Sequence, residues 1–413
     1  MKTKLIPLLI LSLTLPCMTG CRSPDSFDEQ LNGIVAPYRF STVAWESRTI
    51  PGELLDRSLD LIRKTGDKTD TVIEYFSTID LIKALEGEIR AAGTGNGEGN
   101  PVSWQSELTA LEERKGELED TVERVLAEQI EETLAAEGIF NPFTDNLEII
   151  LPPLSFRLEK PPHLLVISPR DRIESIREIT LKQELSPAEM EAIEDEAEGL
   201  GVSALVVKLG GLGSTYPTFV TNDASLRFTI DAATEEWLHQ YLFFKPLGVL
   251  YTLDLTGISP DYEIATINET VASMTSEEIG DIVRRNNYPA LYNASTELQT
   301  EEKGFDFSRE MRLIRIAVDE YLARGEVALA EEYMNEKQQY LASQGYYIRK
   351  LNQAYFAFHG TYADSPTSVN PIGLELEELR EESGSIKDFL EKSALITGRE
   401  ALREALEEQS VNE

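Results

Sequence analysis

Residues 232–242 read AATEEWLHQYL, a stretch with helical periodicity and polar residues that suit metal chemistry. Glu235 and His239 are four residues apart, so a helix places them on one face, about 6 Å from each other. Glu236 is displaced by about 100° around such a helix, from where it can reach a water bound to the ion. The stretch therefore predicts a metal-binding helix with Glu235 and His239 as ligands and Glu236 as the general base.

A third ligand is expected from the segment NETVA at residues 268–272. This segment also has helical character, and a second helix beside the first can supply Glu269 from the side. Carboxylate oxygens bind zinc at about 2.0–2.2 Å, so the carboxylate of Glu269 has to lie within about 6 Å of the imidazole of His239. Histidine is scarce, with 3 in 413 residues, so a metal site has few imidazoles to draw on.

An ExxH pattern followed at this distance by Asn-Glu-x-x-Ala resembles the gluzincin branch of the zincin metallopeptidases, in particular a group of predicted aminopeptidases. In the HExxH form of the motif, two ligands flank a general base on one helix. The resemblance covers roughly residues 160–370 and implies a zincin-like domain, hydrolysis of peptide bonds and one divalent metal ion. Zinc is the expected ion, but Glu235 stands where the motif has histidine, so manganese and ferrous iron become competitive.

The resemblance also implies where substrate and transition state are held. Zincins have an edge strand above the metal helix that pairs with an extended peptide, and the segments containing Gly210, Gly211 and Tyr216 are expected to form it. A donor that steadies the oxyanion is expected downstream of the ligands. The candidates for this and other supporting roles are Asn268, Tyr347, Tyr355, His359 and Tyr362.

The carboxylate at position 235 leaves alternatives open. Two carboxylates and one imidazole bring more negative charge than two imidazoles and one carboxylate, which weakens the Lewis acidity of the ion and raises the pKa of its water. Glu235 can also mark a degenerate site that kept the fold and lost the metal. In a purely structural interpretation, His239 is a hydrogen-bonded core histidine on a helix that Trp237 helps to bury. His163, which follows two prolines, is expected to be structural.

The N-terminus has the pattern of an export signal. Two lysines among the first four residues precede an apolar run over residues 5–16, which is too short to span a bilayer. The run leads to MTGC at residues 18–21, which resembles the lipobox of bacterial lipoproteins. This resemblance implies a signal peptide over residues 1–20, a lipid on Cys21 and a body on the extracytoplasmic face of a bacterial membrane. The alternative is an ordinary secretory signal with an incidental thiol.

The formal net charge of −35 repels nucleic acid and anionic lipid headgroups. No nucleic-acid partner is therefore expected, and the lipid is the expected contact with the membrane. The glycines near residue 211 lack the spacing of a nucleotide-binding loop, and one ExxH motif is half of what a ferritin-like di-iron bundle needs. The predicted partners are a peptide or protein substrate and a membrane.

Changes in composition divide the chain into five expected segments. Two helical runs separated by a glycine-rich loop predict an antiparallel helical hairpin before residue 140. The segments are a signal peptide at 1–20, a tether at 21–50, the helical hairpin at 51–140, a zincin-like domain at 141–373 and an acidic tail at 374–413, expected as a peripheral helix pair with a frayed end.

Within the zincin-like segment, short β-branched runs at 147–151, 164–167 and 202–207 predict strands. Ser186 and Glu189 predict a capping box at the start of a helix. Helices are expected at 186–198, 265–285, 306–343 and 346–359. A small sheet followed by helices is an α+β, predominantly helical fold.

The function predicted from these patterns is that of a lipid-anchored extracytoplasmic metallopeptidase, with a metal-activated water and Glu236 as the general base. The alternative belongs to another class of protein. It is a non-catalytic surface lipoprotein that keeps the zincin fold as a binding or scaffold module and uses the hairpin for partners.

Overall fold

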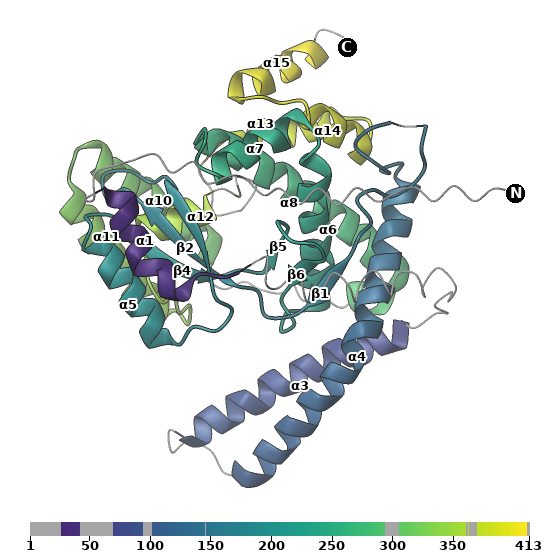
Figure 1. Ribbon diagram of the computed structural model, residues 1–413, viewed down its shortest axis with the longest axis horizontal. Coiled ribbons are helices and arrows are strands. Elements are labelled where there is room, and N and C mark those ends of the chain that lie inside the picture. Colours follow the sequence, from purple (N-terminus) through teal and green to yellow (C-terminus); the bar gives the residue numbers. More distant parts are fainter. Residues whose placement is uncertain are drawn as a thin grey trace, which may run out of the picture.

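The computed structural model describes residues 26–41, 69–93, 101–144, 146–293, 305–360, 362 and 370–410. It is an α+β, predominantly helical fold, which confirms the class predicted from the sequence (Figure 1). The expected signal peptide and Cys21 lie outside the described residues. Among the helices in the described part of the chain, none combines the length and apolarity that crossing a membrane requires.

Helices and two small sheets follow one another along the chain, as labelled in Figure 1. The helices are α1 (Phe27–Val35), η1 (Ala36–Tyr38), α3 (Thr69–Gly93), α4 (Pro101–Ala136), α5 (Pro187–Glu198), α6 (Leu226–Leu242), α7 (Pro246–Leu255), α8 (Tyr262–Asn287), α10 (Phe307–Ala323), α11 (Val327–Ser343), α12 (Gln353–His359), α13 (Pro371–Glu381), α14 (Ile386–Ser393) and α15 (Arg399–Ser410). The strands are β1 (Phe156–Leu158), β2 (His163–Ser168), β3 (Arg177–Leu181), β4 (Ser203–Lys208), β5 (Gly211–Leu212) and β6 (Thr218–Val220).

The first sheet has the strand order β3-β2-β4 and is antiparallel throughout. Its central strand β2 is buried along its whole length. Leu165 and Ile167 face α1 and α5, whereas Leu164 and Val166 face α12, so an apolar residue is needed at every position. The strands predicted at 164–167 and 202–207 are confirmed, and so is the capping box of α5.

The second sheet has the order β1-β6-β5, with β6 in the middle. The expectation that the segment around Tyr216 forms an edge strand is wrong, because that segment leads directly into central β6. The edge strand is β5, which contains Gly211 and pairs antiparallel with β6. This short strand lies beside α6, the helix predicted to carry the metal ligands.

The strand predicted at residues 147–151 is wrong. Leu147 and Ile149 are exposed in a loop. The side-chain amide of Asn141 donates to the carbonyl of Leu147 at 2.6 Å and holds this loop closed. A β-branched run therefore occurs here without a neighbouring strand to pair with.

The helix expected over residues 306–343 is two helices, α10 and α11. The chain turns between them at Gly325, whose φ of +74° is a conformation that glycine adopts without strain. The helix expected over 346–359 begins only at Gln353. The helical spacing of the residues continues through both regions, so it gave no sign of the turn between α10 and α11 or of the late start of α12.

The main hydrophobic core lies between α4, α6 and α8, and α8 is central in it. Helices α3 and α4 form a hairpin that projects from the body in Figure 1. The second half of α4 nevertheless buries Val122, Leu126 and Ile130 in the same core as Trp237 of α6. The core thus crosses the expected boundary at residue 140.

Both segments expected to be peripheral contribute to the structure. Helix α1 lies inside the expected tether and buries Leu31 and Val35 against the first sheet. The expected pair of peripheral helices after residue 374 is wrong, because α13, α14 and α15 bury Leu376 and Phe389, among others, in the main core. A short amphipathic helix buries one narrow stripe, which the sequence shows only as scattered apolar residues in an acidic background.

Candidate metal centre

Helix α6 is fixed at its start and along its buried face. The Ser225 side chain accepts a hydrogen bond from the amide of Phe228 and caps the helix. Trp237 is buried, and its indole N–H donates to the carbonyl of Pro152 at 2.7 Å. With this face anchored in the core, Glu235 and His239 occupy the face that looks toward α8.

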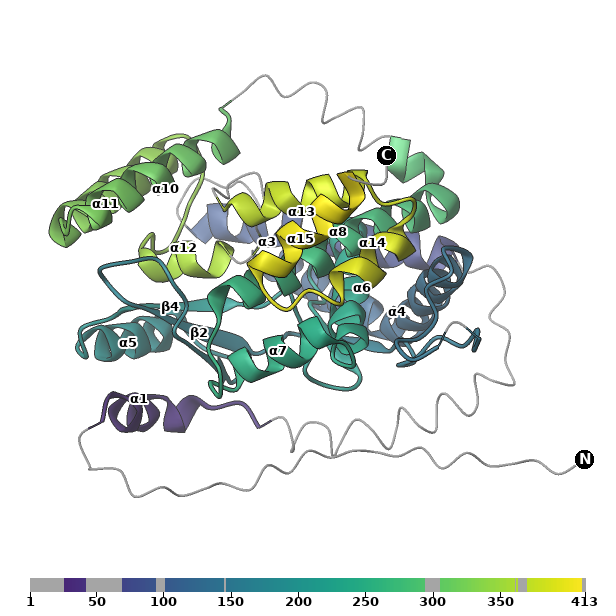
Figure 2. The same ribbon diagram turned by 90° about the horizontal axis from the view of Figure 1, so that it is seen from above.

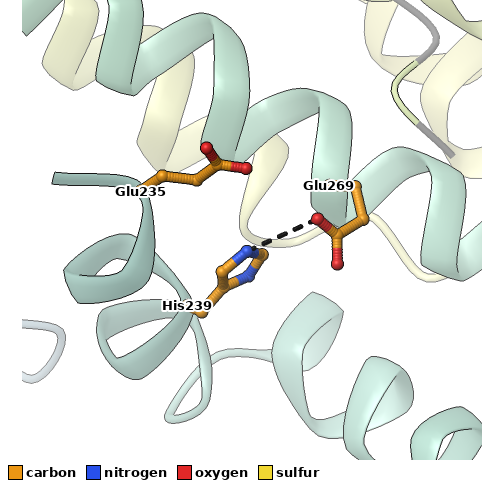
Figure 3. A group of neighbouring side chains, drawn as sticks. All are labelled: Glu235, His239 and Glu269. Carbon is orange, nitrogen blue, oxygen red and sulfur yellow. Dashed lines mark ion pairs between the residues drawn. The ribbon is translucent and has the colours of Figure 1, made fainter. Parts of the chain in front are cut away.

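Helix α8 supplies the third predicted ligand. The Asp261 side chain accepts from the amides of Glu263 and Ile264 and caps this helix. Figure 3 shows Glu235, His239 and Glu269 pointing toward one another from the two helices. Nε2 of His239 lies 3.6 Å from Oε2 of Glu269, so the distance required by the sequence-based prediction is met.

The three side chains have the geometry of a metal-binding group. One ligand atom from each residue lies within 4.8 Å of the other two. Bond lengths of about 2.0–2.2 Å place the ligand atoms of a tetrahedral zinc ion about 3.3 Å apart. The His239 and Glu269 pair is already near that separation, and the ligand atom of Glu235 lies within 4.8 Å of both. One imidazole and two carboxylates therefore fit a divalent cation.

Asn268 orients the imidazole. Its side chain is fully buried, and its Oδ1 lies 2.9 Å from Nδ1 of His239. With the Nδ1 proton donated to this oxygen, Nε2 points at the carboxylates. The expected supporting role of Asn268 therefore matches its position in the structure.

Two tyrosines hold the carboxylate of Glu269. The hydroxyl of Tyr251, on α7, donates to Oε1 of Glu269, and its ring stacks on that of His239 with centroids 5.7 Å apart. Tyr362 also hydrogen-bonds to Glu269. Burial and the charge of Glu269 raise the pKa of both hydroxyls well above the usual value, so both remain protonated donors.

Sequence reasoning missed Tyr251. Its signal in the sequence is weak, because a tyrosine on the helix between the two ligand helices is as typical of packing as of a site. The packing of α7 on both α6 and α8 brings it to Glu269. Tyr362, in contrast, was among the predicted candidates.

Glu236 rests in a cradle made by the edge strand. The backbone N–H of Gly213 donates to its carboxylate. A Cβ atom at Gly211 or at Gly213 would overlap the carboxylate oxygens of Glu236, so both glycines permit the close approach. Gly211, which was predicted to belong to the substrate edge strand, thus touches the predicted general base. The third glycine, Gly210, packs against the ring of Phe228 instead.

The loop that carries the cradle is tied to α6. The side-chain amide of Gln240, next to His239, donates to the carbonyl of Thr215 at 2.9 Å. The hydroxyl of Thr215 in turn lies 3.2 Å from the carbonyl of Leu212 and 3.0 Å from that of Pro217. The position of Glu236 relative to β5 is therefore fixed from both sides.

The charges of the cluster act on one another. Burial alone would lower the pKa of His239, but the charge and hydrogen bond of Glu269, with the charges of Glu236 and Glu235, raise it to about 10. Burial would raise the pKa of Glu269, and the His239 charge with the tyrosine hydrogen bonds lowers it instead. Burial raises the pKa of Glu236 to about 7. The cluster therefore contains Glu236, with a pKa near neutrality, next to the ion pair of His239 and Glu269.

A further acid faces the cluster from the first sheet. Glu178 on β3 keeps solvent exposure, yet the surrounding protein desolvates its carboxylate and raises its pKa to about 7. The charges of Glu269 and Asp254 add to this rise, and a hydrogen bond from Ser175 opposes it. Glu178 was not predicted from the sequence, because a glutamate on an edge strand is typical of a side chain that points to solvent.

Three of the expected oxyanion donors do not reach the cluster. Tyr347 is 86% exposed on the loop before α12, which is wrong for a positioned donor. Tyr355 and His359 pack on each other with ring centroids 4.3 Å apart. Burial raises the pKa of Tyr355 to about 12 and lowers that of His359 to about 4, and no charge of the cluster contributes to either shift. Their helical spacing reflects packing. His163 is buried in β2, as expected for a structural residue.

No family model, no curated protein and no solved structure matches this chain.

Proposed function

We propose that this protein is a metal-dependent hydrolase of peptide bonds with a gluzincin-like, zincin-type centre. The convergence of Glu235, His239 and Glu269 from two helices, with a buried acid next to the first ligand, carries the proposal. The ion is a single divalent cation, and zinc suits the imidazole and carboxylate donors best. Manganese and ferrous iron remain competitive because two of the three ligands are carboxylates.

A bound divalent cation supplies Lewis acidity toward a carbonyl and toward a water molecule. Glu236 accepts a proton from the attacking water and passes it to the leaving amine. A pKa of about 7 suits both transfers near neutral pH. Tyr251 and Tyr362 both hydrogen-bond to Glu269, and Tyr362 is the proposed donor to developing negative charge once a substrate competes for its hydroxyl.

The edge strand β5 is the proposed binding element for an extended polypeptide. Strand β6 pairs with one of its sides, and Gly211 in the strand and Gly213 after it touch Glu236. Main-chain pairing with the open side would place a scissile carbonyl near Glu236 without a requirement for particular side chains. This argues for a polypeptide substrate rather than a small rigid ligand.

The proposal includes export and lipid attachment at Cys21, on the evidence of the N-terminal sequence. The protein would then work on the extracytoplasmic face of a bacterial membrane, held there by its acyl chains. Mass spectrometry of the purified protein tests this part separately. The expected N-terminal peptide begins with an acylated Cys21, and an unmodified or differently cleaved terminus contradicts it.

Metal content and activity test the central claim. The full chain, purified in mild detergent, is analysed for zinc, manganese and iron and assayed on mixed peptides with and without a chelator. We expect one equivalent of metal and cleavage that the chelator abolishes. The His239→Ala variant should lose both metal and activity while it retains the melting curve of a folded protein. A protein without metal that cleaves nothing contradicts the proposal.

The second candidate is a non-catalytic binding or scaffold module. The direct ion pair between His239 and Glu269 favours it, because the two ligands satisfy each other without a cation. A metal ion that binds only the folded state raises the melting temperature of a protein. If this protein is a non-catalytic module without a metal site, added zinc would leave its melting temperature unchanged. A rise that saturates at one equivalent of zinc, and that His239→Ala removes, argues against this candidate.

A further inference from the structure

An aromatic face lies at the junction of α6 and α7. Phe143, Phe243 and Phe244 are 60%, 37% and 46% exposed. The ring of Phe244 is 5.0 Å from that of Phe143 and 5.2 Å from that of Phe243, so the three form one cluster, called the aromatic patch below. Val249 on α7 and Leu395 after α14 are also exposed apolar residues, and the amide of Leu247 donates to the carbonyl of Ala394, which joins the two segments.

The composition of this face departs from that of the chain. Charged residues make up 27% of the sequence, but residues 241–253 read YLFFKPLGVLYTL and contain only Lys245. With a net charge of −35, acidic side chains dominate the charged residues of the protein. The exposed phenylalanines of the aromatic patch are an exception to this polar surface. Exposed aromatic side chains grouped in this way are typical of a surface that contacts an apolar partner.

The N-terminal segment indicates what that partner is. Residues 22–26 are all that separates Cys21 from Phe27, where α1 begins. At no more than about 3.6 Å a residue, a lipid on Cys21 lies within roughly 20 Å of the start of α1. Because α1 is packed on the first sheet, the body cannot stand far from the bilayer. For comparison, α4 alone is about 54 Å long.

The helix that follows the aromatic patch lies on the same side of the molecule as α1. In Figure 2, α1 and α7 lie along the lower side, whereas α10 and α11 lie on the upper side. A short attachment at α1 therefore brings this side to the membrane. Aromatic side chains are the residues that sit at the level of lipid headgroups.

We propose that the aromatic patch rests in the interface of the bilayer that carries the lipid anchor. Phe243 is one turn after His239, whose carbonyl accepts its amide at 3.0 Å, so docking holds the candidate metal centre close to the membrane surface. The anchor and the patch then hold the protein at the membrane at two points, which fixes the orientation of the body relative to the bilayer. This inference rests on the lipid at Cys21 that belongs to the proposed function, and it is independent of the metal.

The cysteine content permits a direct test. The sequence has two cysteines, Cys17 and Cys21. The first leaves with the signal peptide and the second is blocked by acylation, so one introduced cysteine is the single labelling site. A fluorophore is placed at Phe143→Cys or Phe244→Cys. The matched control is Leu313→Cys, which replaces a leucine that is 50% exposed on α10, on the opposite side.

The labelled, acylated proteins are reconstituted into phosphatidylcholine vesicles with and without nitroxide-labelled lipid. We expect quenching at positions 143 and 244 to exceed that at 313 by about threefold or more, as for side chains that sit in the interface. Circular dichroism melts confirm that the three variants fold alike. Equal quenching at all three positions overturns the proposal.

Two further outcomes also overturn it. If the patch joins two copies of the chain, the probe at 143 is shielded from lipid and chemical crosslinking gives a dimer. If mass spectrometry finds Cys21 unmodified, the unacylated protein is added to the same vesicles, and absence of quenching at 143 refutes docking by the patch. Neither outcome affects the metal analysis, so failure here and failure of the proposed hydrolase are distinguishable.

Discussion

The buried carboxylate of Glu194 on α5 and the half-buried carboxylates on α6 and α8 differ in whether the chain supplies enough positive charge to balance them. Glu194 of α5 is 1% exposed and accepts hydrogen bonds from Arg349 at 2.8 and 2.5 Å. Lys350 lies 3.7 Å away, and the amide of Val206 donates at 2.6 Å. The chain supplies every partner that this carboxylate needs, so the group links α5, β4 and the loop before α12.

The group around His239 lacks this balance. Three carboxylates, those of Glu235, Glu236 and Glu269, lie beside one imidazole, and they raise its pKa to about 10. Burial of several acids with one weak base costs stability unless a further cation joins them. The difference teaches that a balanced cluster holds a fold together, whereas a cluster with excess acid is suited to bind a metal ion. Four predictions test this comparison.

The largest effect is expected from the general base. Glu236→Gln keeps the size and hydrogen bonding of the side chain but cannot accept the proton, so kcat should fall by about a thousandfold. Metal analysis should still find one equivalent, because Glu236 is not a ligand. Loss of the metal together with activity would instead make Glu236 part of the coordination.

Mutation of the cluster around Glu194 should lower the stability of the protein and leave its activity unchanged. Glu194→Ala leaves the buried amide of Val206 without its acceptor and separates Arg349 from its partner. We expect a loss of about 3 kcal/mol in the free energy of unfolding, measured by urea titration. Glu194→Gln is the milder control, and metal content should be unchanged in both. An effect on metal binding would show that the two clusters are coupled.

The glycine cradle should affect activity through the position of Glu236. Gly211→Ala forces the carboxylate away from the edge strand, and a displacement of about 1 Å can reduce kcat by about a hundredfold. The pH dependence of kcat should shift as well, because burial against β5 raises the pKa of Glu236. Gly257→Ala, at a turn after α7 with φ +69°, controls for general backbone strain. A loss of stability without a changed pH profile would contradict the positioning role.

Metal affinity should rise with pH. In the metal-free protein His239 is protonated below about pH 10, and the ion must displace that proton to bind. Between pH 6 and 8 the apparent affinity should therefore increase about tenfold per pH unit, measured by competition with a chelating dye. The stability of the metal-free protein has the opposite trend. The ion pair of His239 is fully present below about pH 6.5, and its contribution is lost as pH rises through about 10. A pH-independent affinity would mean that His239 is not a ligand.

The sequence alone located the candidate centre because helical spacing is a local property. Residues four apart share a face in any helix, so Glu235 and His239 had to meet, with Glu236 one position on. The buried strand β2 was likewise visible as a continuous apolar run, and the capping box of α5 as Ser186 and Glu189. These features depend on a few consecutive residues.

Contacts between elements were not visible in this way. Tyr251 reaches Glu269 only because α7 packs against α8, and Glu178 faces the cluster from a different sheet. Tyr355 and His359 share the residue types of site residues, but the packing of α12 turns them toward each other. Spacing along the chain carries no information about which helix lies opposite.

What the sequence by itself determined is the composition of the candidate centre, with Glu236 between Glu235 and His239 on one helix, together with the α+β class. Only the tertiary structure decided that Glu269 lies 3.6 Å from His239, that two glycines cradle Glu236, and that α1 joins the first sheet. The physical reason is the range of the forces involved. Helix geometry acts over four residues, whereas burial of apolar surface brings together elements that are distant in the chain.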